Sequence, residues 1–560
     1  MRNQLKRSAW SAILAVLGIA ALATAIASTA TAKSTKAHAA ASTSMVTLLS
    51  GAGPQSLDPA LDYTTQGSEI NWLVYTGLTT YAHANGVAGT KLIPGLATTL
   101  PKISDGGKTY TVTLRKGQKF SNGDPVVASD FLFTVERSLK IPWGGASTFV
   151  TPYVKGAAAY STGKAKTISG ISTNDTTGKI VIHLTKAYGP FDNVLAFPAY
   201  GLIDPKTVAD ISKVQASDPP AGDGPYMVNN INIGTSFDVV KNPDYVAIPG
   251  IPAGKVDFEE KINSNVEANA LSVLNNSADI FDWADTIPGS LQSQIKAKAK
   301  GRYSLKDLGG SVYYFFLNAS KAPFNNLDAR KAVVEGLNES GLSRLGSGTL
   351  SPACYFLPPA IPGHPSGACP LGKPGTGHLA AAKKLVKESG QANVPIVVYS
   401  EERSPRLQWC EAYEQELKDI GFKNVTLKEV ADENYFTVIG ESKKVDPQTG
   451  FADWNQDFPN PVDFYGVLLD GQSITATSNE NFGQTNDPYI NKVVAKLGAT
   501  PTTELDKVVP QWQALEKYVA KKAYAAVFGY QSFPFLTSSR IKVSYTNDIY
   551  GWDLDGISIK

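Results

Sequence analysis

The sequence predicts a mixed α/β protein, and two segments carry this prediction. Over residues 379–430, two helical patterns alternate with two short apolar runs, an order typical of a βαβ crossover with parallel strands. Residues 108–114 show the alternation of a half-buried strand, with Tyr110, Val112 and Leu114 on one face and threonines on the other. With 10% aromatic and 18% charged residues among 560, the chain is not disordered, and its length suggests about three domains.

The amino terminus has the pattern of an export signal. Three basic residues within the first seven precede an uncharged, largely apolar stretch over residues 8–32, and Ala30-Thr31-Ala32 and Ala37-His38-Ala39 form two cleavage-site patterns. We therefore expect residues 1–39 to be a secretory signal peptide. An uncleaved membrane anchor is the alternative, because the stretch is long enough to span a bilayer. Both interpretations predict an exported protein, either periplasmic or extracellular at the cell surface.

The remaining elements are predicted from periodicity and from turn residues. Residues 45–50 predict a strand, and residues 129–140 predict a helix with Asp130 in its first turn. The α/β segment is expected to contain a helix at 379–389 that ends at Gly390, a strand at 394–400, a helix at 405–420 and a strand at 424–430. Residues 504–525 are helical in pattern, with a break expected at Pro510.

Export makes disulfide bonds possible. Of the three cysteines, two are candidates for a disulfide bond and the third is a candidate core residue. Cys354 and Cys369 bracket a loop with four prolines, which cannot form regular structure by itself. A bridge would restrain that loop, so we predict a disulfide between these two cysteines. Cys410 falls on one side of the 405–420 helix with Tyr413 and Leu417, and we expect it to be a buried core residue.

Motifs for catalysis, nucleotide binding and metal binding are absent from the sequence. It contains no GxSxG, HExxH or Walker loop. The five histidines are scattered, so each is expected on the surface or in the core: His38, His83, His183, His364 and His378. Asp553-Leu-Asp555-Gly begins like a calcium loop, but too few residues follow for its twelfth-position glutamate. We therefore expect no enzymatic activity, no cofactor and no metal, and the net charge of +2 does not favour a nucleic-acid partner.

The run at residues 92–139, LIPGLATTLPKISDGGKTYTVTLRKGQKFSNGDPVVASDFLFTVERSL, carries the most specific motif of the chain. It resembles the signature of the extracellular solute-binding proteins of peptide-type ABC importers, the oligopeptide- and dipeptide-binding family. Further segments that resemble the family occur in order along the chain, two of them before this run and four after it: 56–59, 74–78, 224–226, 241–245, 324–332 and 453–461. Two departures stand out. No cysteine for a lipid anchor follows the leader, and Gln456 and Phe458 replace a small residue and a tyrosine in the family's W-x-A-D-Y motif.

The resemblance implies a two-lobed clamp of the periplasmic-binding-protein type II (cluster C) class, with an extra domain inserted in the first lobe. Its domains would be a discontinuous domain I at 45–80, 200–305 and 530–560, domain II at 81–199, and domain III at 306–529. The hinge would consist of two strands that cross between the lobes near 305–310 and 528–532. Gly309 and Gly310 fit such a crossing, and an ordinary turn is the alternative.

The resemblance also implies a function, which is to capture oligopeptides between the lobes and deliver them to a membrane permease, as a monomer. Asp457 matches the acidic residue that pairs with a ligand's terminal ammonium, and a turn-forming role is its alternative. Trp454, Tyr75 and Tyr313 are candidate cleft aromatics, or ordinary core residues. Arg403 and Arg406 follow a predicted strand, where they could receive a ligand carboxylate or remain solvated. An oligosaccharide ligand and a secreted hydrolase are the alternative functions.

Overall fold

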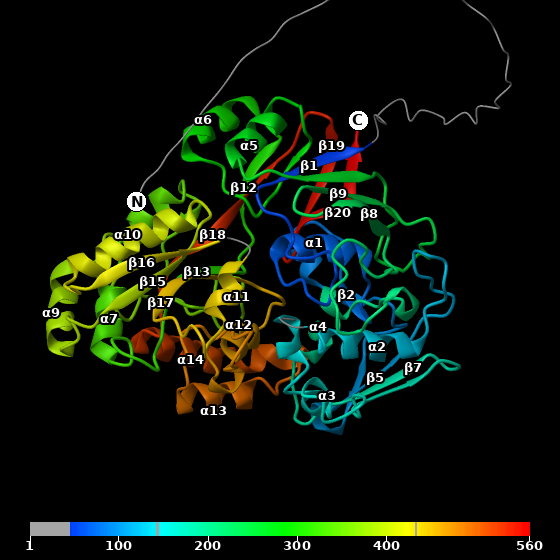
Figure 1. Ribbon diagram of the computed structural model, residues 1–560, viewed down its shortest axis with the longest axis horizontal. Helices are drawn as coiled ribbons and strands as arrows, with labels where there is room; N and C mark the ends of the chain where they lie inside the picture. Colours follow the sequence, from blue (N-terminus) through cyan, green and yellow to red (C-terminus); the bar gives the residue numbers. More distant parts are fainter. Residues whose placement is uncertain (1–44, 142–144, 432–433) are drawn as a thin grey trace, which may run out of the picture. The chain divides into compact units, whose positions relative to one another are not determined.

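Three larger β-sheets organise the protein in the computed structural model, which describes residues 45–141, 145–431 and 434–560 (Figure 1). The predicted signal peptide at 1–39 lies outside the described residues. The sheets contain five, seven and four strands, and two further two-stranded ribbons complete the β-structure of the described residues. Helices and strands alternate along most of the chain, so the predicted α/β class is confirmed.

The five-stranded sheet gathers strands from distant parts of the chain, in the order β11-β1-β10-β9-β8. These strands are Ile280–Phe281, Val46–Ser50, Phe258–Ile262, Ser236–Lys241 and Tyr226–Asn232. The strand β1 is parallel to both of its neighbours, and its Val46 and Leu48, which point to the same face of the sheet, are buried. The strand predicted at 45–50 is therefore confirmed.

The four-stranded sheet is antiparallel, in the order β4-β5-β7-β6. Its strands are Lys102–Ser104, Thr109–Thr113, Lys179–His183 and Ile171–Asn174. The alternation predicted for 108–114 is confirmed, since Tyr110, Val112 and Leu114 are all buried. The helix α2, Ala128–Ser138, packs against β6, and the side chain of Asp130 accepts a 2.8 Å hydrogen bond from the backbone N–H of Val127 at its start.

The seven-stranded sheet has the order β12-β18-β13-β17-β15-β16, with β14 paired to β18. Its strands are Tyr303–Asp307, Ala525–Leu536, Ser311–Leu317, Thr449–Asn455, Ile396–Glu401, Val425–Val430 and Leu350–Ser351. The expected crossover is confirmed, because β15 and β16 are parallel and the helix between them, α10 at Arg406–Asp419, packs on both. The preceding helix α9, Leu379–Ser389, ends at Gly390 as expected, with φ of 69°.

The predicted helix at 504–525 is shorter than expected. A 3₁₀ segment covers Thr502–Val508, the helix α14 runs from Val509 to Lys522, and β18 begins at Ala525. Pro510 lies in the first turn of α14, where its missing N–H costs nothing. It therefore marks the beginning of a helix and not a break inside one.

The long strand β18 links two parts of the seven-stranded sheet. Its residues 525–529 pair with β13, and its residues 532–536 pair with β12. The turn between β12 and β13 contains Gly309, whose φ of 71° suits glycine. After β18, the hairpin β19–β20 (Ile541–Asn547 and Gly551–Ile559) returns to the first sheet, where the indole of Trp552 donates a 3.0 Å hydrogen bond to the carbonyl of Phe281.

The remaining described elements surround these sheets. They are α1 Thr65–Val74, β2 Thr79–Tyr81, β3 Leu92–Pro94, α3 Ala157–Ser161, α4 Phe191–Val194, α5 Val266–Leu274, α6 Gly289–Lys298, α7 Leu327–Gly336, α8 Glu339–Leu345, α11 Tyr435–Ile439, α12 Pro461–Leu468 and α13 Pro488–Leu497. No helix among the described residues is both long and apolar enough to span a bilayer.

The cysteines occupy the positions that the sequence predicts. A disulfide joins Cys354 to Cys369 across the proline-rich loop, and Cys410 is free and fully buried. The Cys410 side chain packs on the inner side of α10, next to Tyr413 and Leu417, which are also buried.

Candidate ligand-binding cleft

A cleft of about 620 Å³ lies among segments that are far apart in the sequence. The loop after β1, α1, the β8–β9 region, the start of α10, the end of β17 and the tip of the β19–β20 hairpin all contribute to its wall. This volume is in the range of cavities that bury a small molecule or a short peptide. The wall combines apolar side chains with many polar and charged groups, which could orient a ligand.

Asp457 lies on the cleft wall, just after β17. One of its carboxylate oxygens accepts a 2.7 Å hydrogen bond from the hydroxyl of Tyr63. Removal from water raises the pKa of Asp457 to about 7, although the bond from Tyr63 partly offsets the rise. The sequence-predicted acid is therefore placed in the cleft, with no cation paired to it in the described residues.

Asp463 holds the segment that carries Asp457. This side chain is fully buried in the first turn of α12. Its Oδ2 accepts a 2.9 Å hydrogen bond from the backbone N–H of Asp457 and a 3.3 Å bond from the indole of Trp454. Burial, followed by the charge of Asp457, raises the pKa of Asp463 well above its ordinary value. The two hydrogen bonds fix the positions of both predicted ligand residues.

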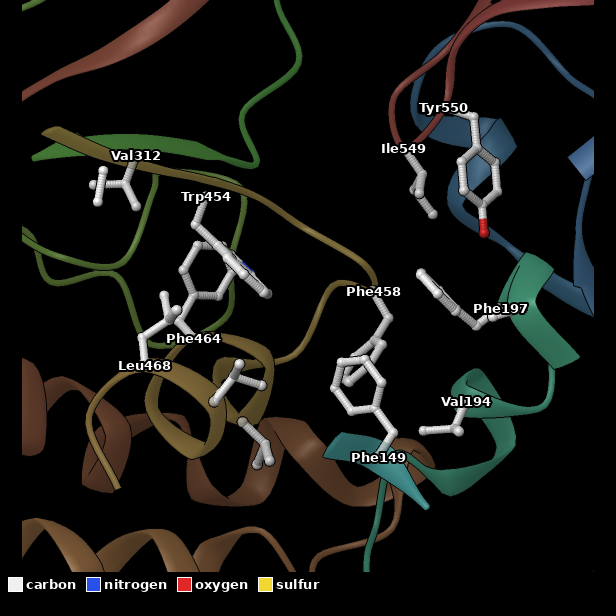
Figure 2. Close-up of a cluster of buried hydrophobic side chains, with 14 of the residues drawn as sticks. Phe149, Val194, Phe197, Val312, Trp454, Phe458, Phe464, Leu468, Ile549 and Tyr550 are labelled. Carbon is white, nitrogen blue, oxygen red and sulfur yellow. The ribbon is translucent and has the colours of Figure 1, made fainter. Parts of the chain in front are cut away.

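Trp454 lines the cleft and is also part of the buried apolar structure. Figure 2 shows it on the same segment as Phe458, which faces Phe149. The rings of Phe149 and Phe458 lie 5.5 Å apart, and Tyr63 meets Trp454 edge-on at 6.0 Å. Trp454 therefore lines the cleft and also packs in the core. Phe458 is a core residue.

Arg406 lines the cleft but is already neutralised by the protein. Its guanidinium is paired with Glu401 and lies 2.5 Å from Asp453, and it stacks over the ring of Phe451 at 4.7 Å. It is buried at the start of α10, so the alternative of a solvated charge is wrong for this residue. A guanidinium held by two carboxylates and a ring forms a fixed part of the wall.

Arg403 also lines the cleft, 3.4 Å from Glu401, and about a fifth of its side chain is exposed. Because Glu401 is shared with Arg406, Arg403 is the cation of the wall that has the most room to contact a ligand.

Tyr75 and Tyr313 do not belong to the part of the cleft wall that the structure describes. The hydroxyl of Tyr75 donates a 3.0 Å hydrogen bond to the carbonyl of Pro220, and its side chain is almost fully buried. Tyr313 is buried among aromatic rings, with Trp409 and Phe451 each 5.8 Å away. Both residues therefore occupy the core positions that were the alternative to a cleft contact.

Tyr63 and Glu480 are two of the cleft residues that the sequence-based set lacks. Tyr63 bonds to Asp457 from a position 394 residues earlier, and no local pattern announces such a pair. Glu480 is buried on the cleft wall, and burial together with the charge of Asp457 raises its pKa to about 8. Its neighbour Asn481 is fully buried, and no local sequence pattern predicts that Glu480 lies in a cleft.

One histidine, His83, lies in a cluster of ionisable side chains. His83 lies 2.7 Å from Asp555 and 3.6 Å from Asp553, and its ring stacks on Trp72 at 3.9 Å. Burial opposes protonation, but the two carboxylates outweigh it and raise the pKa of His83 to about 9. The three side chains bring their potential ligand atoms within 4.8 Å of one another, so they could hold a cation. A protonated imidazole already supplies a positive charge there, and this group lies outside the cleft wall.

Comparisons with known proteins agree with this architecture. The chain is 25% identical over 521 residues to a probable D,D-dipeptide-binding periplasmic protein of Escherichia coli, covering 90% of this chain and 92% of that protein. A clavulanic acid biosynthesis oligopeptide binding protein 2 superposes with a TM-score of 0.78 at 21% identity, over 92% of this chain and 95% of that one. OppA of Haemophilus influenzae, in complex with RPPGFSPFR, has a TM-score of 0.76 at 20% identity, over 92% and 99%.

The fold class is therefore that of the two-lobed periplasmic binding proteins, as the resemblance implies. Residues 91–476 match the model described as bacterial extracellular solute-binding proteins, family 5 Middle. This match covers well over half of the chain, including the 92–139 signature and the cleft residues of β17. The chain belongs to family 5 of the bacterial extracellular solute-binding proteins.

Proposed function

We propose that the protein is the extracytoplasmic binding component of an ABC import system, and that it captures oligopeptides in the cleft and delivers them to a membrane permease. The observation that carries this proposal is the cleft itself, where the acidic side chain of Asp457 meets Tyr63 from a distant segment of the chain. The relatives named above are described as binding dipeptides or oligopeptides. The protein would act as a monomer and by binding alone, without turnover of its ligand.

Asp457 would bind the terminal ammonium of the peptide. A carboxylate removed from water is costly unless a positive charge meets it, and the raised pKa of Asp457 reflects that cost. A ligand ammonium would provide the missing charge, and a charge-assisted hydrogen bond of this kind is worth about 1.5–3 kcal/mol. Arg403 could receive a carboxylate of the same ligand.

Capture would depend on the relative movement of two lobes. We place domain I at 45–80, 200–305 and 530–560, domain II at 81–199 and domain III at 306–529, with the hinge at the β12–β13 turn and in β18. Tyr63 and Asp457 would then belong to different lobes, and their hydrogen bond would form only when the lobes are closed. A ligand that contacts both lobes stabilises the closed state, which a permease can recognise.

Isothermal titration calorimetry of residues 40–560 with di- to octapeptides tests this proposal. Saturable binding, with the peptides recovered intact by mass spectrometry, is the expected result. Binding of oligosaccharides alone would overturn the assignment of peptides as the ligand. Cleavage of the peptides would show that the protein is a hydrolase and not a binding protein. Mass spectrometry of the exported protein would show whether residues 1–39 are removed or remain as an anchor.

A further inference from the structure

The cleft wall carries more acidic than basic side chains. Six charged side chains line it: Glu401, Arg403, Arg406, Asp453, Asp457 and Glu480. The two arginines are engaged with two of the four carboxylates, since Arg406 bridges Glu401 and Asp453 and Arg403 lies against Glu401. Two carboxyl groups, those of Asp457 and Glu480, therefore have no cationic partner among the described residues.

Glu480 is the less compensated of these two carboxyl groups. Asp457 accepts a hydrogen bond from the hydroxyl of Tyr63, whereas no hydrogen bond or ion pair of the described residues reaches the carboxylate of Glu480. The residue is only 7% exposed, so water solvates it poorly. Burial, and then the charge of Asp457, raises the pKa of Glu480 to about 8. To be ionised at neutral pH, a buried acid of this kind needs an external positive charge, because an unpaired buried charge is expensive.

The loop that carries Glu480 is held in place by its neighbours. Asn481 donates hydrogen bonds to the carbonyls of Asp470 and Thr485, at 3.1 and 2.9 Å, and accepts one from the N–H of Thr485 at 2.9 Å. Asn479 donates a 2.9 Å bond to the carbonyl of Asn481. Both asparagines are fully buried, so the loop presents Glu480 in a fixed position.

Apolar surface lies next to this carboxylate. Phe482 and Phe436 line the same cleft, with their rings 6.2 Å apart. Lysine and arginine side chains pack their methylene stems on such surface while the charged end reaches an acid. The neighbourhood of Glu480 therefore has the two features that a basic side chain requires.

We propose that the cleft selects peptides with two positive charges near the amino-terminal end, namely the terminal ammonium bound by Asp457 and a lysine or arginine side chain bound by Glu480. This inference rests on the proposed peptide-binding function and specifies the class of peptide. With both charges in place, every carboxylate of the wall has a cationic partner.

Calorimetry with matched pentapeptides of alanine tests the inference. Each carries either lysine or its uncharged analogue norleucine at position 1, 2 or 3, so that the stem is kept and the charge removed. For at least one position, the lysine peptide is expected to bind about 10- to 100-fold more tightly than its norleucine counterpart. Equal affinities at all three positions would overturn the inference while leaving peptide binding intact, whereas no binding of any peptide would overturn the proposed function itself.

The variant Glu480→Gln tests whether Glu480 causes the preference for lysine over norleucine peptides. It should lose the lysine preference and keep the affinity for the norleucine peptide. Glu411→Gln, which removes the same charge from an exposed position on α10, should behave as the unmodified protein. Equal weakening of both peptides by Glu480→Gln, in a variant with an unchanged unfolding temperature, would overturn the role of Glu480.

Discussion

The hydroxyl of Tyr63 donates a 2.7 Å hydrogen bond to the carboxylate of Asp457, across 394 residues of sequence. Tyr63 precedes the helix α1, and Asp457 follows the strand β17, so the bond joins two segments that are far apart in the sequence. The rings of Tyr63 and Trp454, 6.0 Å apart, reinforce this contact. These groups place an acid beside apolar surface, and the following predictions test what that arrangement does.

Asp457→Asn should weaken the binding of peptides with a free amino terminus by about 10- to 100-fold, because the amide cannot form a charge-assisted bond with an ammonium. Peptides with an acetylated terminus should bind equally to both proteins, and calorimetry measures both affinities. Asp506→Asn, at an exposed position, is the matched control. Equal losses for free and acetylated peptides would exclude the ammonium role.

Peptide affinity should rise between pH 5.5 and 7.5. Asp457 has a pKa of about 7, and the form that accepts an ammonium is the ionised one, which gains population as the pH increases. Burial raises the pKa of Asp457, and hydrogen bonds with Tyr63 and Asp463 lower it. The charge of Asp457 in turn raises the pKa of its neighbours Asp463 and Glu480.

Tyr63→Phe removes the donor and should therefore raise the pKa of Asp457 and displace the same profile to higher pH. Titrations at several pH values, below the pKa of the peptide amine, measure this shift. An identical profile for the variant would contradict the role of the Tyr63 hydrogen bond.

His83→Asn should reduce stability and alter its pH dependence. The folded-state pKa of His83, about 9, lies above the ordinary value of 6.5, so its stabilisation is fully present below pH 6.5 and is lost as the pH rises towards 9. The expected loss is on the order of 1–3 kcal/mol in the free energy of unfolding, measured by denaturant titration at pH 6 and pH 9. The exposed His183→Asn serves as control. A variant with the same slope as the unmodified protein would refute the ion triad.

Loss of the Cys354–Cys369 disulfide should destabilise the protein by about 2–3 kcal/mol, because the bridge closes a short loop whose ends are 15 residues apart. Denaturant unfolding of the double variant Cys354→Ser, Cys369→Ser measures this difference. Thiol titration of the unmodified protein should find one thiol, that of Cys410, and only after unfolding, since it is buried. Three thiols in the unreduced, unfolded protein would contradict the bridge.

Local structure was largely predictable from the sequence. Some features depend only on the residues of a single element, so they can be predicted without the fold. Examples are the alternation of Tyr110, Val112 and Leu114 and the glycine that ends α9. The boundary at Pro510 was placed less well, because proline is compatible both with a break and with a first helical turn.

The site was predictable only where a motif carried it. Asp457 and Trp454 follow from the 453–461 segment, and both lie on the cleft wall. Tyr63 and Glu480 reach the cleft through contacts with distant segments, which no local pattern encodes. Arg406 was expected near a ligand or in solvent, but Glu401 and Asp453 neutralise it, and their pairing depends on three separate elements.

A crystal structure of residues 40–560 with a lysine-containing peptide tests the account most directly. The expected structure has the peptide enclosed in the cleft, with its terminal nitrogen about 3 Å from the carboxylate of Asp457. A peptide bound elsewhere, or one in the cleft with its ammonium turned away from Asp457, would contradict it.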